Sequence, residues 1–378
     1  MQAVRDSWKR PGHVPVSSTF SKQVLVWFDQ HGRKDLPWQH SCDPYSIWIS
    51  EIMLQQTRVD TVIPYYERFV QRFSDVWQLA GAGLDEVLHY WTGLGYYARA
   101  RNVHKAARQI CERHQGRFPE NMKEMTALPG IGRTTAAAIL ALGFHQRHAI
   151  LDGNVKRVLA RYFAVEGWPG ESKVEAQLWV HAESLLPDHD IADYTQAMMD
   201  IGATLCTRTR PGCLLCPVQK GCMAFGQRRQ HELPVSRPSR NLPQRKVQIA
   251  LVQNNEGAIW LEKRPPLGVW GGLYSFPEFM DEACLQEWLD RQYGADVTKK
   301  KTLPVITHAF SHFRLHMYPT LVYVADKPIG VMEDAVGVWY KASSEKIGLA
   351  APVHKTLQQV IPRIKEGSHD AHSSMCKT

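Results

Sequence analysis

A cluster of cysteines constrains this chain more than any other feature of its sequence. Four of the eight cysteines share one short segment, with the spacing C-x6-C-x2-C-x5-C. Four thiolates on one loop can hold either a zinc ion or a [4Fe–4S] cluster. Zinc sites usually contain two C-x2-C pairs, and only one such pair is present here, so both groups stay open at this point. The four residues are Cys206, Cys213, Cys216 and Cys222.

The composition sets broad limits on the kind of protein. The chain has 378 residues, 44% of them apolar, which is enough for two domains with their own cores. The net charge of +8 suits a polyanionic partner but is weak evidence alone. Met1–Thr19 has no apolar core typical of a signal peptide, and no apolar run is long enough to span a membrane. We therefore expect a cytoplasmic protein without membrane association, nucleoid-associated if the source is bacterial.

The first two-thirds of the chain have the periodicity of helices and no long alternating strands, which predicts an all-α domain over residues 1–225. Clusters of Gly and Pro separate the helical stretches. The predicted helices are Lys22–Gln30, Ile47–Val59, Asp85–Tyr90, Ala98–His114, Thr134–Gly143, Val155–Tyr162 and Lys173–Leu186.

The composition changes after residue 225. The stretch 226–246 has three prolines, six Arg or Lys residues and one acidic residue, which predicts an extended basic linker on the surface. β-branched and aromatic residues then alternate in several short runs around one helical stretch, which predicts a smaller α+β domain over residues 247–365. A polar, disordered tail is expected over 366–378. The predicted elements are the strands Val247–Gln253, Ala258–Lys263, Thr307–His312 and Met317–Ala325 and the helix Asp281–Tyr293.

A tight turn precedes an Ala-rich helix at Leu128-Pro129-Gly130-Ile131-Gly132. Gly132 lets the backbone approach a neighbouring group closely, and the following helix exposes unpaired N–H groups at its start. Such a turn can bind a DNA phosphate without reading the base sequence. The alternative is an ordinary packing corner between two helices.

Two carboxylates are candidates for catalysis. Asp152, in Leu151-Asp152-Gly153-Asn154, can cap the helix that follows it, and the same carboxylate could stabilise positive charge on a sugar during glycosyl transfer. Glu51 stands on a helix with an apolar stripe and shares a face with Gln55. In isolation such a Glu is usually solvated, but when buried it has a raised pKa and can act as a general acid or activate a water molecule.

Together these motifs resemble the MutY family of adenine DNA glycosylases, within the endonuclease III superfamily of helix-hairpin-helix enzymes. The resemblance covers nearly the whole chain, and the uneven cysteine spacing matches the iron–sulfur loop of that superfamily. Further matching motifs are Leu36-Pro37-Trp38, Gln55-Gln56-Thr57 and Gly93-Leu94-Gly95-Tyr96-Tyr97-Ala98-Arg99-Ala100-Arg101-Asn102.

The resemblance implies a monofunctional enzyme that hydrolyses the N-glycosidic bond of adenine mispaired with 8-oxoguanine or guanine. Its partner would be double-stranded DNA containing such a mispair, its cofactor a [4Fe–4S] cluster on the four cysteines, and its oligomeric state a monomer. Glu51 would be the catalytic acid and Asp152 the second carboxylate. Trp38, Gln196 and Thr134 would line the adenine pocket, and the contacts with DNA would come from Gln55, Gln56, Thr57, Tyr96, Gly130, Gly132, Arg133 and Lys156.

One position separates the MutY family from endonuclease III. Endonuclease III carries a lysine directly after the Arg of the hairpin motif, and this amine forms a Schiff base with the sugar. The present chain has Thr134 there, and a hydroxyl group cannot form an imine. We therefore expect no strong lyase activity, although Lys156 could trap an aldehyde sugar incidentally.

The C-terminal domain resembles a Nudix fold with a degraded metal-binding motif. Glu278 and Glu287 fall in place, but Gln286, Arg291 and Tyr293 replace residues that the motif requires. A divalent metal needs that carboxylate cluster, so we expect no hydrolysis of nucleoside diphosphates. By the same family resemblance, the domain would recognise 8-oxoguanine through Phe310-Ser311-His312.

Three other functions remain as alternatives. A bifunctional endonuclease III-like glycosylase and lyase is disfavoured by Thr134 and by the additional domain. A non-catalytic iron–sulfur DNA-binding protein is disfavoured because both Glu51 and Asp152 are present. A nucleotide pyrophosphatase fused to a binding domain is disfavoured by the degraded Nudix motif.

Overall fold

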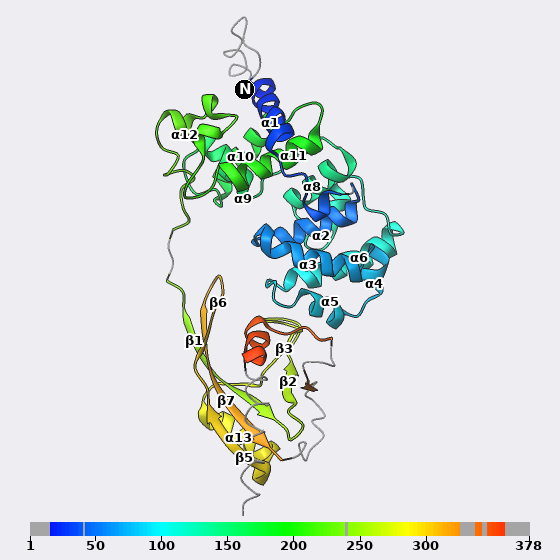
Figure 1. Ribbon diagram of the computed structural model, residues 1–378, viewed down its shortest axis with the longest axis vertical. Helices are drawn as coiled ribbons and strands as arrows, with labels where there is room; N and C mark the ends of the chain where they lie inside the picture. The colour runs from blue at the N-terminus through cyan, green and yellow to red at the C-terminus, as the bar shows by residue number, and fades with distance from the viewer. Residues whose placement is uncertain (1–15, 41, 239–240, 326–336, 342–345, 360–378) are drawn as a thin grey trace, which may run out of the picture. The chain divides into compact units, whose positions relative to one another are not determined.

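The computed structural model describes residues 16–40, 42–238, 241–325, 337–341 and 346–359 (Figure 1). The expected tail 366–378 lies outside the described residues. The chain divides into two compact units. Unit 1 combines Met1–Ala80 with Lys105–Ser239, and unit 2 combines Gly81–His104 with Arg240–Thr378.

Unit 1 is built from helices, as expected. The helix α6 has its predicted bounds, begins among residues grouped with unit 2 and continues into unit 1. The helices are α1 (Val16–His31), η1 (Pro37–Gln39), α2 (Pro44–Leu54), α3 (Val59–Arg72), α4 (Val76–Gly81), α6 (Ala98–His114), α7 (Met122–Ala127), α8 (Arg133–Phe144), α9 (Gly153–Tyr162), α10 (Ser172–Ser184), α11 (Ile191–Asp200), η2 (Ile201–Leu205), η3 (Cys213–Leu215), η4 (Gln219–Gly221) and α12 (Met223–Gly226).

One predicted helix is in fact two. We predicted a single helix over Ile47–Val59, but α2 ends at Leu54 and α3 begins at Val59. Gln55 is extended and Gln56 is left-handed, with φ of 57°, so the helical hydrogen bonds cannot continue through them. The break exposes the side chain of Gln56 on the loop between the two helices.

The helices that position the site begin with identifiable caps. Asp43 accepts hydrogen bonds from the amides of Tyr45 and Ser46 and begins α2, whose first residue is proline. Asp152 accepts one from the amide of Val155, at 2.7 Å, and begins α9, so the predicted capping role is confirmed. These caps fix the first turn of α2, which carries Glu51, and of α9, which follows Asp152.

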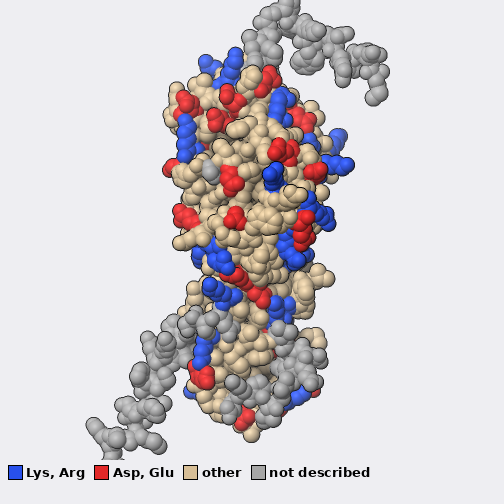
Figure 2. Space-filling model, turned by 90° about the vertical axis from the view of Figure 1, so that its right-hand side faces the viewer, with Lys and Arg blue, Asp and Glu red and all other residues tan. Residues whose placement is uncertain are grey.

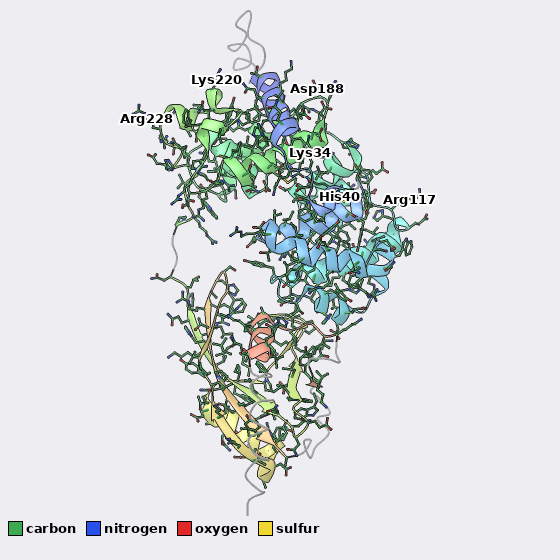
Figure 3. All side chains as sticks on the ribbon, in the orientation of Figure 1. Lys34, His40, Arg117, Asp188, Lys220 and Arg228 are labelled. Atoms are coloured by element: carbon green, nitrogen blue, oxygen red, sulfur yellow. The ribbon has the colours of Figure 1, made fainter. Side chains whose placement is uncertain are left out.

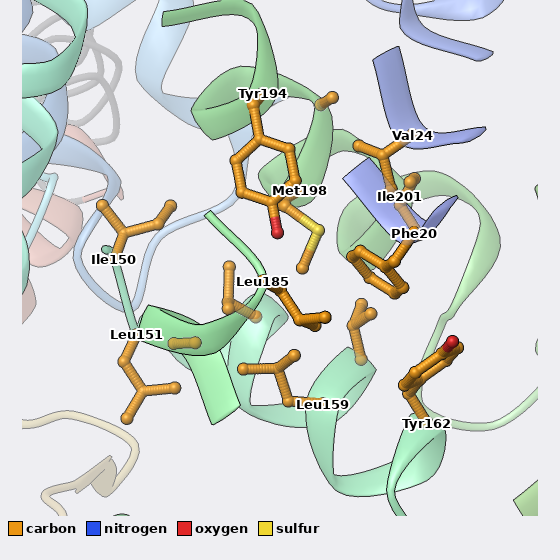
Figure 4. Close-up of a cluster of buried hydrophobic side chains, with 14 of the residues drawn as sticks. Phe20, Val24, Ile150, Leu151, Leu159, Tyr162, Leu185, Tyr194, Met198 and Ile201 are labelled. Atoms are coloured by element: carbon orange, nitrogen blue, oxygen red, sulfur yellow. The ribbon is translucent and has the colours of Figure 1, made fainter. Parts of the chain in front are cut away.

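An apolar cluster joins the helices that frame the site (Figure 4). Side chains from α1, α9 and α11 meet in it, and burial of each large side chain contributes about 1.5–3 kcal/mol to folding. The cluster holds the start of α9 and the middle of α11 in a fixed relation. Its labelled members are Phe20, Val24, Ile150, Leu151, Leu159, Tyr162, Leu185, Tyr194, Met198 and Ile201.

Unit 2 contains a mixed sheet of eight strands in the order β3-β2-β1-β7-β5, with β4 beside β1, β6 beside β7 and β8 beside β2. The central pair β1 and β7 is parallel, from Gln244 opposite Arg314 to Gln253 opposite Tyr323, and the other pairs are antiparallel. The elements are α5 (Leu84–Trp91), β1 (Gln244–Gln253), β2 (Ile259–Lys263), β3 (Tyr274–Ser275), β4 (Glu278–Phe279), α13 (Glu282–Gln292), η5 (Gly294–Asp296), β5 (Val297–Thr302), β6 (Ile306–Ala309), β7 (Arg314–Val324) and β8 (Gly337–Tyr340).

The helix α13 packs on the sheet through Leu285, Trp288 and Leu289, which form a core with residues of β1, β2 and β7. Together with the helical unit 1, this arrangement is the expected combination of an all-α part and a smaller α+β part. The predicted strand Thr307–His312 is shorter in the structure, because β6 ends at Ala309 and the next residues form a turn.

The segment expected to be a surface linker is partly built into the folded units. Its last residues, from Gln244, belong to β1. Leu233 is 1% exposed, and its carbonyl oxygen accepts a hydrogen bond from Arg161. In the described part of the chain, no helix has the length and apolarity that a membrane span requires.

Candidate active site

A cleft of about 1660 Å³ opens in unit 1 among several helices. The end of α2, the start of α8, the start of α9 and one face of α11 all contribute side chains to its wall. The residues predicted for catalysis and for the adenine pocket all line it: Trp38, Glu51, Thr134, Asp152 and Gln196. Residues far apart in the sequence are thus brought together in one site.

Glu51 lies in the last two turns of α2. Burial, which penalises the ionised form, and to a lesser extent the negative charge of Asp152 together raise the pKa of this carboxyl to about 8. A carboxyl with this pKa is largely protonated at neutral pH. Glu51 can therefore donate a proton to a bound group.

Asp152 is held in place by the helix that it caps. One carboxylate oxygen accepts from the amide of Val155 at 2.7 Å, and the other accepts from the side-chain amide of Asn154 at 3.1 Å. Burial raises the pKa of Asp152, while these hydrogen bonds and the charge of Arg157 act in the opposite direction. The two carboxylates thus have different surroundings, a condition under which one can act as an acid and the other as a charged group.

A buried ion pair fixes the far wall of the cleft. Asp200 is fully buried, and its carboxylate accepts from the Arg33 guanidinium at 2.6 and 2.9 Å and from the Arg33 amide at 2.8 Å. The side-chain amide of Gln196 also donates to Asp200, at 2.8 Å. The orientation of Gln196 is therefore set by Asp200, which leaves the amide oxygen of Gln196 as an acceptor.

The other predicted pocket residues are placed by packing. Trp38, 6% exposed, meets the ring of Tyr66 edge-on at 5.3 Å. Gln55 donates to the Thr135 hydroxyl at 3.3 Å, which links the end of α2 to the start of α8. Gln55, Gln56 and Thr57 all line the cleft.

The predicted hairpin turn has the expected backbone. Gly130 has a φ of 79°, which favours glycine, and Gly132 caps α8 without a side chain of its own. The two predicted basic contacts are engaged within the protein. Arg133 pairs with Glu183 and lies over the ring of Trp179, and Lys156 pairs with Glu175 at 2.7 Å. Lys156 is not part of the cleft wall, whereas Lys34 is.

The four clustered cysteines line one small cavity of about 30 Å³. Arg161, 2% exposed, donates to the Cys206 sulfur at 3.3 Å and to the carbonyl oxygens of Thr207, Arg208 and Leu233. Among the described residues, no group of three or more His, Cys, Asp or Glu side chains has ready metal-binding geometry. The donor set is nevertheless four thiols around one cavity, which fits a cluster ligated by cysteine alone.

Charged side chains of both signs are mixed on one face of the molecule. Figure 2 shows Lys and Arg interspersed with Asp and Glu over the face turned to the viewer. Lys220 and Arg228 project outward beside the cysteine loop (Figure 3). The described part of the face shown therefore has no patch of a single charge sign.

In unit 2, Ser311 and His312 form the exposed tip of the hairpin between β6 and β7. The amide of Phe310 donates to the carbonyl oxygen of Phe313 at 2.9 Å and closes the turn, and the two rings stack at 4.5 Å. Of the Nudix-like carboxylates, Glu278 pairs with Arg264 at 2.8 Å. The expectation that this unit has no hydrolase activity stays a prediction.

Comparison with known proteins identifies the family. Residues 49–184 match the model of the HhH-GPD superfamily base excision DNA repair proteins, and residues 248–359 match the NUDIX domain. The chain is 39% identical over 340 residues to the adenine DNA glycosylase of Buchnera aphidicola subsp. Acyrthosiphon pisum, covering 90% of this chain and 97% of that protein. It is 33% identical over 377 residues to the adenine DNA glycosylase of Homo sapiens, covering 83% of this chain and 69% of that protein.

This chain belongs to the adenine DNA glycosylase family. The resemblance stated from the sequence is thereby confirmed, as is the combination of a helix-hairpin-helix domain with a Nudix-like domain. Among solved structures, a thermostable thymine-DNA glycosylase has a TM-score of 0.51 and 30% identity, covering 56% of this chain and 97% of that one.

Sequence reasoning missed several residues that build the site. Arg33 and Asp200 form the buried pair, and Arg157 donates to the Cys206 carbonyl at 2.6 Å and to the Asn154 side chain at 2.9 Å. Asp200 had a usable signal, because it is a lone charge in the apolar run Ala197–Ile201 and follows Gln196 by one helical turn. A charge in such a run is usually buried with a partner.

Proposed function

We propose that the protein is a monofunctional DNA glycosylase that hydrolyses the N-glycosidic bond of adenine mispaired with 8-oxoguanine or guanine in base-excision repair. The observation that carries the proposal is the pair of carboxylates in the cleft, with the pKa of Glu51 raised to about 8 beside Asp152. We also propose that it acts as a monomer on chromosomal DNA in the cytoplasm.

The chemistry assigns different roles to the two carboxylates. Adenine leaves poorly as an anion, so Glu51, protonated at neutral pH, would donate a proton to the adenine ring as the bond breaks. Positive charge then develops on the deoxyribose. Asp152, ionised and held by Val155 and Asn154, would stabilise that charge until water attacks. After it has lost its proton, Glu51 could also activate the attacking water.

Adenine must leave the base stack to reach these groups, which costs a few kcal/mol. The cleft would receive the flipped base between Trp38, Thr134 and Gln196. With its nitrogen donating to Asp200, Gln196 offers its amide oxygen to an amino group, and the exocyclic amine of adenine is such a group. This arrangement supports adenine over a base that presents a carbonyl at the same position.

The DNA would be held by groups from both units. Gln56, exposed and left-handed, and Tyr96, 53% exposed with a φ of 50°, are suited to enter the duplex where the base leaves. Gln55 and Thr57 lie beside Gln56, and the Gly130 and Gly132 turn offers backbone amides to a phosphate. Arg133 and Lys156 would first have to exchange their carboxylate partners for phosphates.

The opposite base would be read by unit 2. An 8-oxoguanine differs from guanine in a carbonyl at C8 and a proton at N7, and a hydroxyl or imidazole can bond to that edge. Ser311 and His312 are both exposed at the tip of their turn, with Phe310 beneath them. The mispair preference would come from this turn.

We further propose that Cys206, Cys213, Cys216 and Cys222 hold a [4Fe–4S] cluster. When bound, it would stabilise the loop between η2 and α12 and leave the glycosidic chemistry to the carboxylates. Arg157 and Arg161 tie this loop to α9, the helix that Asp152 caps. The cluster would thereby support the geometry of the site.

The second candidate is a bifunctional lyase acting on oxidised pyrimidines. A glycosylase assay on duplexes with adenine opposite 8-oxoguanine, adenine opposite guanine, and thymine glycol decides between them. We expect excision from the two adenine duplexes, with strand cleavage only after alkali. Excision of thymine glycol, or strand cleavage without alkali at the rate of base release, would reject the proposal.

A further inference from the structure

The segment Gly81–His104 packs with the C-terminal part of the chain as one compact unit. Tyr97 donates to the Leu349 carbonyl at 2.9 Å, and the Leu349 amide donates to the Thr92 hydroxyl at 3.2 Å. Lys263 pairs with Asp85 at 2.8 Å. The loop that carries Tyr96 is therefore held by the same unit that carries the Ser311–His312 turn.

Tyr96 is held outward by its own backbone and by a neighbouring cation. Its φ of 50° is unusual for a residue with a side chain, and the ring is 53% exposed. The buried guanidinium of Arg99 lies 5.5 Å from the Tyr96 ring and 5.5 Å from the Trp91 ring. A loop held in this way presents an aromatic ring to solvent at small entropic cost.

One arginine connects this loop to the neighbourhood of the turn. Arg101, in the first turn of α6, donates to the Gly271 carbonyl at 2.7 Å. The backbone of Gly271 packs closely on the preceding turn, because a Cβ there would lie 2.4 Å from the Pro266 oxygen. Burial of Arg101 lowers its pKa, as expected for a guanidinium taken partly out of water.

The residue before Gly271 completes the connection. Trp270 has a φ of 55°, and its ring lies 5.3 Å from Phe310 and 5.6 Å from His308. Phe310 in turn closes and supports the turn of Ser311 and His312. A continuous series of contacts thus runs from that turn through Trp270 and Gly271 to Arg101 and the Tyr96 loop.

We propose that Arg101 is a specificity-determining residue: through Gly271 and Trp270 it holds the Tyr96 loop and the Ser311–His312 turn as one DNA-reading surface. The inference rests on the proposed function. When two groups must meet DNA together, fixing one relative to the other removes part of the ordering cost of binding. When the base opposite adenine bonds well to Ser311, Tyr96 is also placed correctly on the DNA. A base that bonds poorly to Ser311 gives no such help.

A simple phosphate contact by Arg101 would have different consequences. Loss of such a contact weakens binding to every duplex equally and reduces the salt dependence of binding. Loss of a positioning contact instead reduces the difference in excision rate between the two adenine duplexes. Lys105, exposed one turn further along α6, is a matched control for removal of a positive charge.

The test uses the full chain and single-turnover rates at fixed salt on duplexes with adenine opposite 8-oxoguanine and opposite guanine. Arg101→Ala should reduce the ratio of the two rates about fivefold, within the range of coupling between contacting residues. Arg101→Lys should restore part of the ratio, and Lys105→Ala should leave it unchanged. Trp270→Leu, which breaks the series at another point, should act like Arg101→Ala and serves as the second variant if that protein is unstable.

A double variant sharpens the result. Combining Arg101→Ala with Ser311→Ala should reduce the ratio by less than the product of the single effects, because both act through one surface. Multiplicative effects, or an unchanged ratio in both Arg101→Ala and Trp270→Leu, would overturn the inference. Equal losses on both duplexes with a weaker salt dependence would replace it with a phosphate contact. If the unmodified chain excises adenine from neither duplex, the proposed function itself fails.

Discussion

Glu51 and Asp152 line the same cleft, and the charge of Asp152 adds to burial in raising the pKa of Glu51 to about 8. Asp152 has hydrogen-bond donors that favour its ionised form, and the causes acting on Glu51 all favour the neutral form. Burial still raises the pKa of Asp152, but its donors act against that effect, and we therefore propose that Glu51 is the acid and Asp152 the charged group.

The first prediction concerns the pH dependence of base release. Glu51 acts in its protonated form, which is lost as the pH rises through its pKa. Single-turnover excision should therefore fall above about pH 8, approaching a tenfold decrease per pH unit. Rates measured from pH 6 to 10, with duplex binding checked at each pH, test this. A rate that increases through pH 8 would show that Glu51 acts as a base in the limiting step.

The second prediction is that Glu51→Gln abolishes excision but not binding of the mispaired duplex, because the amide has a similar shape and no proton to donate. It should also stabilise the fold. A carboxyl whose pKa is raised on folding costs stability increasingly as the pH rises from its unfolded value towards about 8. Glu51→Gln should thus raise the free energy of unfolding by on the order of 2 kcal/mol at pH 8 and by little at pH 5.

The matched control for that experiment is Glu67→Gln on the exposed face of α3. It should change neither excision nor the pH dependence of stability. Wild-type rates in Glu51→Gln would reject Glu51 as the acid, whereas loss of activity without the pH-dependent gain in stability would contradict the raised pKa.

The features of this site that could be predicted from the sequence are those made by residues close together in the chain. The cap made by Asp152 is local, and four cysteines in one segment remain close in any fold, so both could be predicted. The break after Leu54 was missed, because apolar periodicity continues through Gln55 and Gln56, and only the backbone angles end the helix.

Long-range pairs could not be predicted in this way. Arg33 and Asp200 are separated by 167 positions, and no local pattern states which arginine meets which carboxylate. The packing of Gly81–His104 with the C-terminal part was equally hidden, because Tyr97 and Arg101 bond to backbone carbonyls, which every residue offers. Family resemblance supplied a proposed role for Tyr96 but not the contacts that hold its loop.

The third prediction concerns Asp200, which fixes Arg33 and Gln196. Asp200→Asn removes the charge and leaves a half-buried guanidinium without its ionic partner, which should destabilise the protein by on the order of 2 kcal/mol. The orientation of Gln196 is lost as well. At temperatures where the variant is still folded, excision should therefore be about tenfold slower. Thermal melting and single-turnover rates measure both effects. Asp193→Asn, exposed on the cleft wall of the same helix, is the control and should change neither.

The fourth prediction concerns the cysteine loop. Purified protein should be brown and contain about four iron atoms per chain. Cys216→Ser should lose iron and loosen the loop, which protease sensitivity near Cys206 would report. Cys111→Ser is the control, since that lone thiol donates to the Val76 carbonyl in another part of unit 1. One zinc and no iron per chain would show that the loop is a zinc site.

The last prediction tests why the enzyme should release a base without cutting the strand. Thr134 lies on the cleft wall at the start of α8, and its hydroxyl cannot form an imine. Thr134→Lys places an amine in the cleft, so strand cleavage without alkali and borohydride trapping should both increase at least tenfold. The measurement is a denaturing gel of substrate and of the covalent complex for both proteins.

We predict that Lys34, rather than Lys156, accounts for any background trapping. Lys156 is paired with Glu175 and is absent from the cleft wall, whereas Lys34 lines the cleft and donates to the Asp29 carbonyl at 2.8 Å. Residual trapping in the unmodified protein should therefore decrease in Lys34→Arg more than in Lys156→Arg, because arginine keeps the charge and forms no imine. Trapping in Thr134→Lys should be unaffected by either change. If Thr134→Lys gains no trapping while its adenine excision is intact, the amine at this position does not reach the sugar, and the argument from Thr134 against a lyase fails.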